Sequence, residues 1–355
     1  MHQHTKVGIL GAGHVGSHVA YSLAAQGICD QIVLLDIDGQ KASSQAEDIA
    51  DAVPSLLHPV QVTAGGYDDI ADADVVVLAA CGSAVEQDRL QELEATWAVA
   101  EAIAPQLVAC GFCGIVVSIS NPCDIIAQRF AQRTGLQVIG TGTALDSARL
   151  RRRLAQWLGV APHSVCAYML GEHGDSQVAA LHAASVAGIP LFLWLEQHGL
   201  PRQALAPLLE QTVYAGWHVL QGKGCTEFGI GGAAAALIRA ILRDEKAVLP
   251  CSTLLQGQYG QQGVYASTPL SHRRPGGRDY LGAPPQPPGT TGLGPELRHS
   301  AQTLGLRPPL GEQLHSQKSA SGCRKRSFSN FPGRSADPAS QRYTPALPTW
   351  SAVHP

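Results

Sequence analysis

Short apolar runs alternate with longer segments of helical periodicity in the first part of the chain. Residues 6–10, 31–36, 72–80 and 114–122 have the length and the aliphatic composition of buried strands. Residues 17–26 and 89–111 carry apolar side chains at helical spacing. This alternation predicts an α/β fold, in which a parallel sheet is covered by helices on both faces.

A glycine-rich segment, GAGHVG, joins the first predicted strand to the first predicted helix. Gly11 allows a tight turn, Gly13 lets the backbone approach a pyrophosphate, and Gly16 lets helix and strand pack closely. Asp36 ends the next strand about twenty residues further on, where it can accept hydrogen bonds from an adenosine ribose. These features predict a dinucleotide site in a Rossmann-type, doubly wound sheet. Because Asp36 would repel a 2′-phosphate, they favour NAD over NADP.

Two further segments, GTALDSARLRRRLA and YMLGEHGDSQ, carry residues suited to acid–base chemistry. Asp146 and Arg149 are three residues apart and share one helical face, and His173 lies in a predicted loop after a strand. Reduction of a 2-oxo acid needs a proton donor, an anion that orients it and a fork for the substrate carboxylate, which His173, Asp146 and Arg149 can supply. Taken separately, the histidine could belong to a simple turn and the acid and arginine to an exposed ion pair.

With these motifs in order, the sequence resembles the lactate/malate dehydrogenase family. The segments GAGHVG, SNPCD, GTALDSARLR, GEHGDS and KGCTEFGIG occur in family order over residues 6–268. The resemblance implies an NAD-dependent oxidoreductase acting on a small 2-oxo or 2-hydroxy acid. It also implies a Rossmann-type domain followed by an α+β substrate domain, and a homodimer or homotetramer.

The resemblance also implies roles for individual residues. His173 would be the catalytic acid and base with Asp146 as its partner, and Arg149 would bind the substrate carboxylate through two hydrogen bonds. Asn121 would contact both the substrate and the nicotinamide of the cofactor. Thr226 would line the substrate pocket.

Arg89 matches the arginine of a mobile loop that polarises the substrate carbonyl when the loop closes. Before it, CGSAVEQD contains no Arg or Lys to pair with a second carboxylate, so we expect malate not to be a substrate. Pyruvate and L-lactate are the first expectation. An L-2-hydroxyisocaproate-type activity on bulkier 2-oxo acids is the alternative, because DRLQEL resembles that variant and Gly216 stands where many lactate enzymes have alanine.

Composition limits the remaining possibilities. The chain has 355 residues, 45% hydrophobic, and no apolar run long enough to span a bilayer. The first predicted strand begins at residue 6, which leaves no room for a signal peptide. We therefore expect a cytoplasmic protein with no membrane or nucleic-acid partner and no metal in its site.

The composition changes sharply near residue 270. The last 86 residues hold 13 of the 23 prolines and carry 9 Arg and 2 Lys against 2 Asp and 2 Glu. We predict three segments: an NAD-binding domain at 1–142, a truncated substrate domain at 143–269, and a disordered tail at 270–355. A function of another class stays open, namely a catalytically impaired dinucleotide-binding protein whose basic tail binds a partner.

The tail also has the pattern of an out-of-frame reading. The resemblance stops after GVYASTP, where the family continues with a segment like V-I-G-x-x-G-V and then L-P-L-S. Read one base later, the codons of His272, Asp279 and Tyr280 can yield only Ile or Thr, which fits that continuation. We therefore predict one inserted base at the codon of Pro269.

Overall fold

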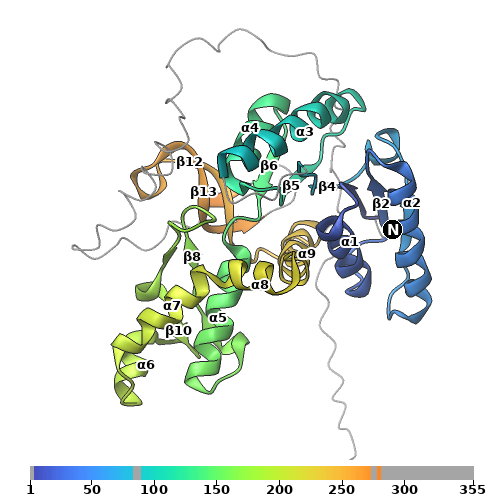
Figure 1. Ribbon diagram of the computed structural model, residues 1–355. Helices are drawn as coiled ribbons and strands as arrows, with labels where there is room; N and C mark the ends of the chain where they lie inside the picture. Colours follow the sequence, from blue (N-terminus) through green and yellow to red (C-terminus); the bar gives the residue numbers. More distant parts are fainter. Residues whose placement is uncertain (1–3, 83–88, 273–277, 281–355) are drawn as a thin grey trace, which may run out of the picture. The chain divides into compact units, whose positions relative to one another are not determined.

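The computed structural model describes residues 4–82, 89–272 and 278–280, and its largest element is a nine-stranded sheet (Figure 1). Six neighbouring strands are parallel, in the order β3-β2-β1-β4-β5-β6. That order is typical of dinucleotide-binding folds, in which ligands bind where the strand order reverses. The strands are β1 (Lys6–Leu10), β2 (Gln31–Leu35), β3 (Gln61–Ala64), β4 (Val75–Leu78), β5 (Ile115–Ser118) and β6 (Gln137–Gly140).

Helices cover both faces of these strands because successive strand residues point to opposite sides. Val7 and Ile9 of β1 belong to one core cluster, together with α1 (His14–Ala25), α2 (Gly39–Ala52) and α9 (Phe228–Leu242). Leu10 belongs to another, together with α3 (Arg89–Ala109) and α4 (Cys123–Thr134). The predicted doubly wound α/β sheet is confirmed.

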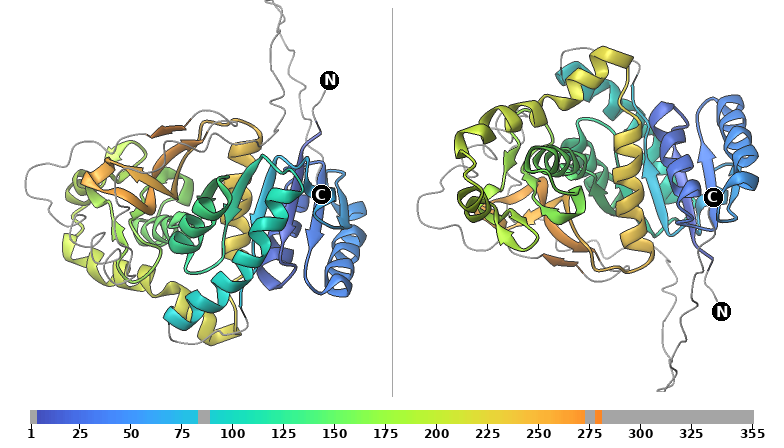
Figure 2. Two further views of the ribbon diagram at one scale, coloured as in Figure 1. Left: turned by 90° about the horizontal axis from the view of Figure 1, so that it is seen from above. Right: turned by 90° about the horizontal axis from the view of Figure 1, so that it is seen from below.

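Three antiparallel strands extend the sheet beyond β6. Strand β12 (Val248–Gln256) pairs with β6 at Ser252 and Gly140, and β13 (Gln262–His272) and β14 (Arg278–Tyr280) follow. Figure 2 shows the orange strands beyond the green part of the sheet and the gold helix α9 beside the blue helix α1. The second half of the chain therefore contributes strands to the main sheet and a helix to its core.

The rest of the second half surrounds α5 (Ala144–Leu158), which begins soon after β6 and is capped at its C-terminus by Gly159, a residue with a positive φ of 68°. A third apolar cluster joins α5 to α6 (Leu191–Gln197) and α7 (Leu205–Val213), and α8 (Ala215–Lys223) follows. Short strands complete this α+β region: β7 (Val165–Cys166), β8 (Met169–Leu170), β9 (Val178–Ala179), β10 (Ser185–Val186) and β11 (Ile189–Pro190). The 3-10 turns are Val53–Ser55, Asp68–Ile70, Pro162–Ser164, Leu181–Ala183, Arg202–Ala204 and Gln258–Gly260.

All described residues lie within one compact unit, so the predicted boundary between residues 142 and 143 stays a prediction. Most of the predicted tail, at 273–277 and 281–355, lies outside the described residues, as does the segment 83–88 of the predicted mobile loop. In the described part, no helix has the length and hydropathy needed to cross a membrane.

Candidate active site

Three of the predicted residues meet around one buried carboxylate. The Nδ1 atom of His173 lies 2.6 Å from Oδ2 of Asp146, and Nη1 of Arg149 donates to Oδ1 of the same carboxylate at 2.9 Å. The side chain of Asp146 is 1% exposed, whereas those of Arg149 and His173 are 14% and 29% exposed. A buried anion is thus paired with two groups that reach solvent.

The fold explains this arrangement. Asp146 lies in the first turn of α5 and Arg149 lies one turn later on the same face, so one carboxylate can reach both partners. His173 follows β8, and Gly171 before it exchanges two backbone hydrogen bonds with Ser267 of β13, at 3.0 and 2.8 Å. The loop that carries His173 is therefore fixed by a strand almost one hundred residues further along the chain.

The electrostatics of the pair favour a charged histidine. Burial by itself would lower the pKa of His173, but the hydrogen bond and the negative charge of Asp146 outweigh it and raise that pKa. Burial would likewise raise the pKa of Asp146, but His173 and Arg149 lower it. The arrangement can therefore hold a proton on His173 near neutral pH and release it to a neighbouring acceptor.

Asp124 is a site residue that the sequence analysis did not identify. It lies in the first turn of α4, and its Oδ2 accepts the backbone N–H of His173 at 2.8 Å. Burial raises the pKa of Asp124 to about 6, and its charge adds to the forces that raise the pKa of His173. An acidic residue directly after the SNPC segment was the available signal.

The other predicted substrate residues are placed less completely. Asn121 is exposed after β5, and the Asn121–Pro122 peptide bond is cis. Thr226 is half-buried in the loop between α8 and α9, and two residues into α9 a Cβ on Gly229 would touch Leu145, next to Asp146. Arg89 begins α3, but its side chain lies outside the described residues.

The glycine segment forms a turn between β1 and α1. A Cβ on Gly16 would lie 1.9 Å from the carbonyl oxygen of Gly11, and Gly11 itself has a φ of 102°. A Cβ on Gly13 would meet no obstacle, since its one close neighbour would be Nζ of Lys41, at an ordinary contact distance of 3.8 Å. Backbone and space thus fit a pyrophosphate at Gly13, beside a positive charge and the N-terminus of α1.

Asp36 directly follows β2 and braces this turn. Its Oδ2 accepts the N–H of Ala12 at 2.7 Å and its Oδ1 accepts the N–H of Asp38 at 3.0 Å. Each carboxylate oxygen can accept more than one hydrogen bond, so a ribose hydroxyl can still bind. Ile37, next to Asp36, is fully exposed, and neither it nor Lys41 was identified from the sequence.

Nearly all of the described chain matches two family models. Residues 5–139 match the NAD binding domain of lactate/malate dehydrogenases, and residues 143–282 match the alpha/beta C-terminal domain of the same enzymes. The second match continues past residue 268, where we expected the resemblance to end. Its range covers both β13 and β14, which pair with each other in the structure.

Individual relatives agree with these models. The L-lactate dehydrogenase of Fusobacterium nucleatum subsp. nucleatum is 41% identical over 276 residues, which are 76% of this chain and 86% of that enzyme. L-lactate dehydrogenase 3 of Bacillus cereus is 38% identical over 289 residues, 79% of this chain and 91% of that one.

Solved structures give the same result. The minor L-lactate dehydrogenase of Enterococcus mundtii, in its ligands-bound form, has a TM-score of 0.80 and 34% identity, covering 85% of this chain and 96% of that one. The malate dehydrogenase of Cryptosporidium parvum, at 24% identity and a TM-score of 0.76, shares the fold. The chain therefore belongs to the lactate/malate dehydrogenase family and is an NAD-dependent 2-hydroxy-acid dehydrogenase.

Proposed function

We propose that this enzyme interconverts pyruvate and L-lactate, with His173 as acid and base, Asp146 as its partner and Arg149 as the carboxylate-binding residue. The observation that carries the proposal is the single carboxylate of Asp146, which contacts both His173 and Arg149. The relatives named above as L-lactate dehydrogenases support this substrate.

The proton would move through Nε2 of His173. A carboxylate only accepts hydrogen bonds, so Nδ1 donates to Asp146, and Nε2 is left to face the substrate oxygen when substrate binds. NAD, when bound, supplies or accepts the hydride. His173 would give its proton to the carbonyl oxygen in reduction and take it back from the hydroxyl in oxidation, while Asp146 stabilises the charged ring.

Arg149 would orient the substrate. A guanidinium has five N–H donors, and in the described part of the chain the structure gives Arg149 one acceptor, Asp146. The remaining donors form a planar fork that suits a carboxylate. Arg89 would then polarise the carbonyl, Asn121 would contact substrate and nicotinamide, and Thr226 would line the pocket, as the family resemblance implies.

The cofactor would bind along the glycine turn. Gly11, Gly13 and Gly16 would cradle the pyrophosphate, with Lys41 as a counter-charge, and Asp36 would accept hydrogen bonds from the adenosine ribose. The exposed side chain of Ile37 would pack against the adenine. The charge of Asp36 would repel the 2′-phosphate of NADPH, so the site should prefer NADH even with the cation Lys41 near the glycine turn.

A second candidate substrate is a bulkier monocarboxylic 2-oxo acid. A Cβ on Gly216 would lie 3.6 Å from Nη1 of Arg149, so the glycine leaves space for about one methyl group beside the residue that would bind the carboxylate. With glycine at position 216 the pocket should accept branched substrates such as 2-oxoisocaproate more readily than it would with alanine there.

A substrate panel tests the proposal. NADH oxidation is followed with pyruvate, 2-oxoisocaproate and oxaloacetate, for the unmodified enzyme and for Gly216→Ala. We expect the highest kcat/KM with pyruvate, little with oxaloacetate, and a fall for 2-oxoisocaproate in the variant. Efficient reduction of oxaloacetate would contradict the pocket model, which depends in part on residues 83–88, outside the described residues.

Assembly is a separate proposal. The family resemblance implies a homodimer or homotetramer, and exposed apolar side chains on and near α8, namely Tyr214, Trp217 and Val219, are consistent with a subunit contact.

A further inference from the structure

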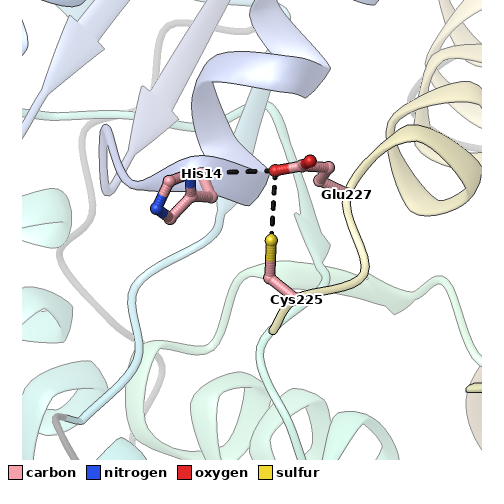
Figure 3. Close-up of side chains that lie close together, drawn as sticks. All are labelled: His14, Cys225 and Glu227. Carbon is pink, nitrogen blue, oxygen red and sulfur yellow. Dashed lines mark hydrogen bonds and ion pairs between the residues drawn. The ribbon is translucent and has the colours of Figure 1, made fainter. Parts of the chain in front are cut away.

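Three side chains of different chemistry converge between the first turn of α1 and the loop before α9 (Figure 3). The thiol of Cys225 donates to Oε2 of Glu227 at 3.3 Å, and Nδ1 of His14 lies 3.7 Å from the same oxygen. One donor atom from each of the three residues lies within 4.8 Å of the others. None of these three side chains has a role in the proposed reaction, although His14 begins α1 beside the proposed pyrophosphate site and Thr226 lies between the other two residues.

We propose that His14, Cys225 and Glu227 bind a zinc ion. Zinc bonds of about 2.0 Å to nitrogen and oxygen and about 2.3 Å to sulfur place the ligand atoms of a tetrahedral site roughly 3.3–3.5 Å apart. The two contacts made by Oε2 of Glu227, at 3.3 and 3.7 Å, are close to that spacing. The ligand atoms of His14 and Cys225 lie within 4.8 Å of each other and would have to come to the same spacing.

Two of the ligands are held and the third can adjust. Lys223 pairs with Oε1 of Glu227, which leaves Oε2 facing the other two residues. The side chain of Glu227 is 10% exposed, whereas that of His14 is 80% exposed, so the imidazole can rotate toward the ion at little cost in packing. The helices that carry the two sides are packed together, since a Cβ on Gly231 of α9 would lie 3.1 Å from the carbonyl oxygen of His18.

His18 completes the surroundings without being a ligand. Its Nδ1 lies 3.7 Å from Oε2 of Glu227 but donates to the carbonyl oxygen of His14 at 2.6 Å. That hydrogen bond fixes the backbone of His14, the exposed ligand. It also occupies Nδ1 of His18, which therefore cannot bind the ion. The fourth position of the ion is therefore left for water, as in zinc sites with three protein ligands.

The donor set selects the ion. A nitrogen, a thiolate sulfur and a carboxylate oxygen suit Zn²⁺ and its spectroscopic substitute Co²⁺, whereas Mg²⁺ and Ca²⁺ prefer oxygen ligands alone. Because the ligand is the thiolate and not the thiol, Cys225 must lose its proton when the ion binds. Binding should therefore weaken as the pH falls.

Cobalt binding tests the site directly. The purified full-length enzyme, stripped with a chelator, is titrated with Co²⁺ while thiolate-to-cobalt charge-transfer absorption is recorded, and bound Co²⁺ is then displaced with Zn²⁺ or challenged with Mg²⁺. We expect one thiolate-bound ion per chain, displaced by Zn²⁺ and not by Mg²⁺.

Variants locate the ion. Cys225→Ser should abolish the charge-transfer band, and His14→Ala and Glu227→Gln should each weaken Co²⁺ binding at least about tenfold. Cys166→Ser removes an exposed thiol elsewhere in the chain and should change nothing. Circular dichroism checks that each variant is folded. Absence of the band in the unmodified enzyme, or a band that survives Cys225→Ser, would overturn the proposal.

Discussion

At the scale of single residues, the proposed chemistry depends on three charged side chains that lie together in a partly buried site. The carboxylate of Asp146 is hydrogen-bonded to both His173 and Arg149, and the carboxylate of Asp124 accepts the backbone N–H of His173. Each of these contacts is a hydrogen bond to a charged group in partly buried surroundings, where such bonds are strongest. Substitutions that change one contact and leave the shape intact should therefore give separable effects.

Replacing the proposed acid and base separates chemistry from cofactor binding. His173→Gln should lower turnover by about 10²–10⁴-fold, because no group remains to transfer the proton. NADH affinity, measured by fluorescence titration, should be unchanged because the glycine turn is intact. His198→Gln, at an exposed histidine stacked on Trp194, is the matched control. If His173→Gln retains turnover, the proton donor is another residue.

Arg149→Lys tests the fork. A lysine keeps the charge but cannot form two parallel hydrogen bonds to a carboxylate. Transition-state binding should weaken by about 3 kcal/mol, which lowers kcat/KM for pyruvate roughly 150-fold. Steady-state kinetics on Arg149→Lys and on the exposed Arg152→Lys provide the comparison. Equal losses in both variants would contradict the role of Arg149.

The pH profile tests Asp124. In the reduction direction His173 must be protonated, so kcat/KM should fall as the pH rises through its raised pKa. In Asp124→Asn the side-chain oxygen can still accept the N–H of His173, but the charge that raises this pKa is gone. The alkaline limb should move to lower pH, by less than about one unit because Asp146 keeps the larger effect.

In the oxidation direction His173 must be neutral, so activity is lost as the pH falls. In Asp124→Asn this acidic limb should also move to lower pH. Asp72→Asn, at an exposed carboxylate paired with Lys6, is the control and should leave both limbs in place. A shift of the Asp124→Asn profile to higher pH would show that the sign assigned to Asp124 is wrong.

At the scale of elements, the turn between β1 and α1 combines two requirements that can be tested apart. Gly16 is needed for packing, since a Cβ there would strike the backbone of Gly11. Gly13 has an ordinary negative φ of −74° and open space beside it, so nothing in the fold itself requires glycine at that position. A ligand that fills this space explains why a glycine is useful there.

Gly13→Ala should therefore fold normally and bind NADH poorly. We expect a melting temperature close to that of the unmodified enzyme and a loss of NADH affinity of at least about tenfold, because the methyl group occupies the space proposed for the pyrophosphate. Gly39→Ala, where a Cβ would also meet open space, is the control and should bind NADH normally. Unchanged NADH affinity in Gly13→Ala would place the cofactor elsewhere.

At the scale of the whole molecule, the proposed active site depends on the strands that come last in the described chain. Strand β13 contributes Ser267, whose backbone exchanges two hydrogen bonds with Gly171 near His173. The hydroxyl of Ser267 also accepts the backbone N–H of Thr143 at 2.9 Å. The predicted change of reading frame lies two residues further on, at Pro269. Residues 270–272, directly after this codon, continue the strand that fixes the loop carrying His173.

Resequencing the gene across the Pro269 codon tests that prediction. We expect one extra base, and its removal should restore a family-like C-terminus. If the shift is present in the cell, the chain as written should be less stable and less active than the corrected one, because the substrate domain would lack its final elements. A gene that encodes residues 270–355 without a shifted family-like reading contradicts the frameshift.

The sequence by itself determined much of the fold because its signals are local. The six predicted strands and helices lie within a few residues of the observed elements, as at Lys6–Leu10, and GAGHVG marked the turn that follows. Strand β3, with a single buried residue in four, gave no comparable signal. The family motifs also led to His173, Asp146 and Arg149 before any geometry was available.

Only the tertiary structure decided how distant segments combine. Asp124 contacts His173 across 49 positions of sequence, and β13 fixes the catalytic loop from almost one hundred residues away. His14 and Cys225 meet because α1 and α9 pack together in one core. Such contacts depend on which faces of the sheet and helices are buried against one another, and a local pattern carries no information about its partner.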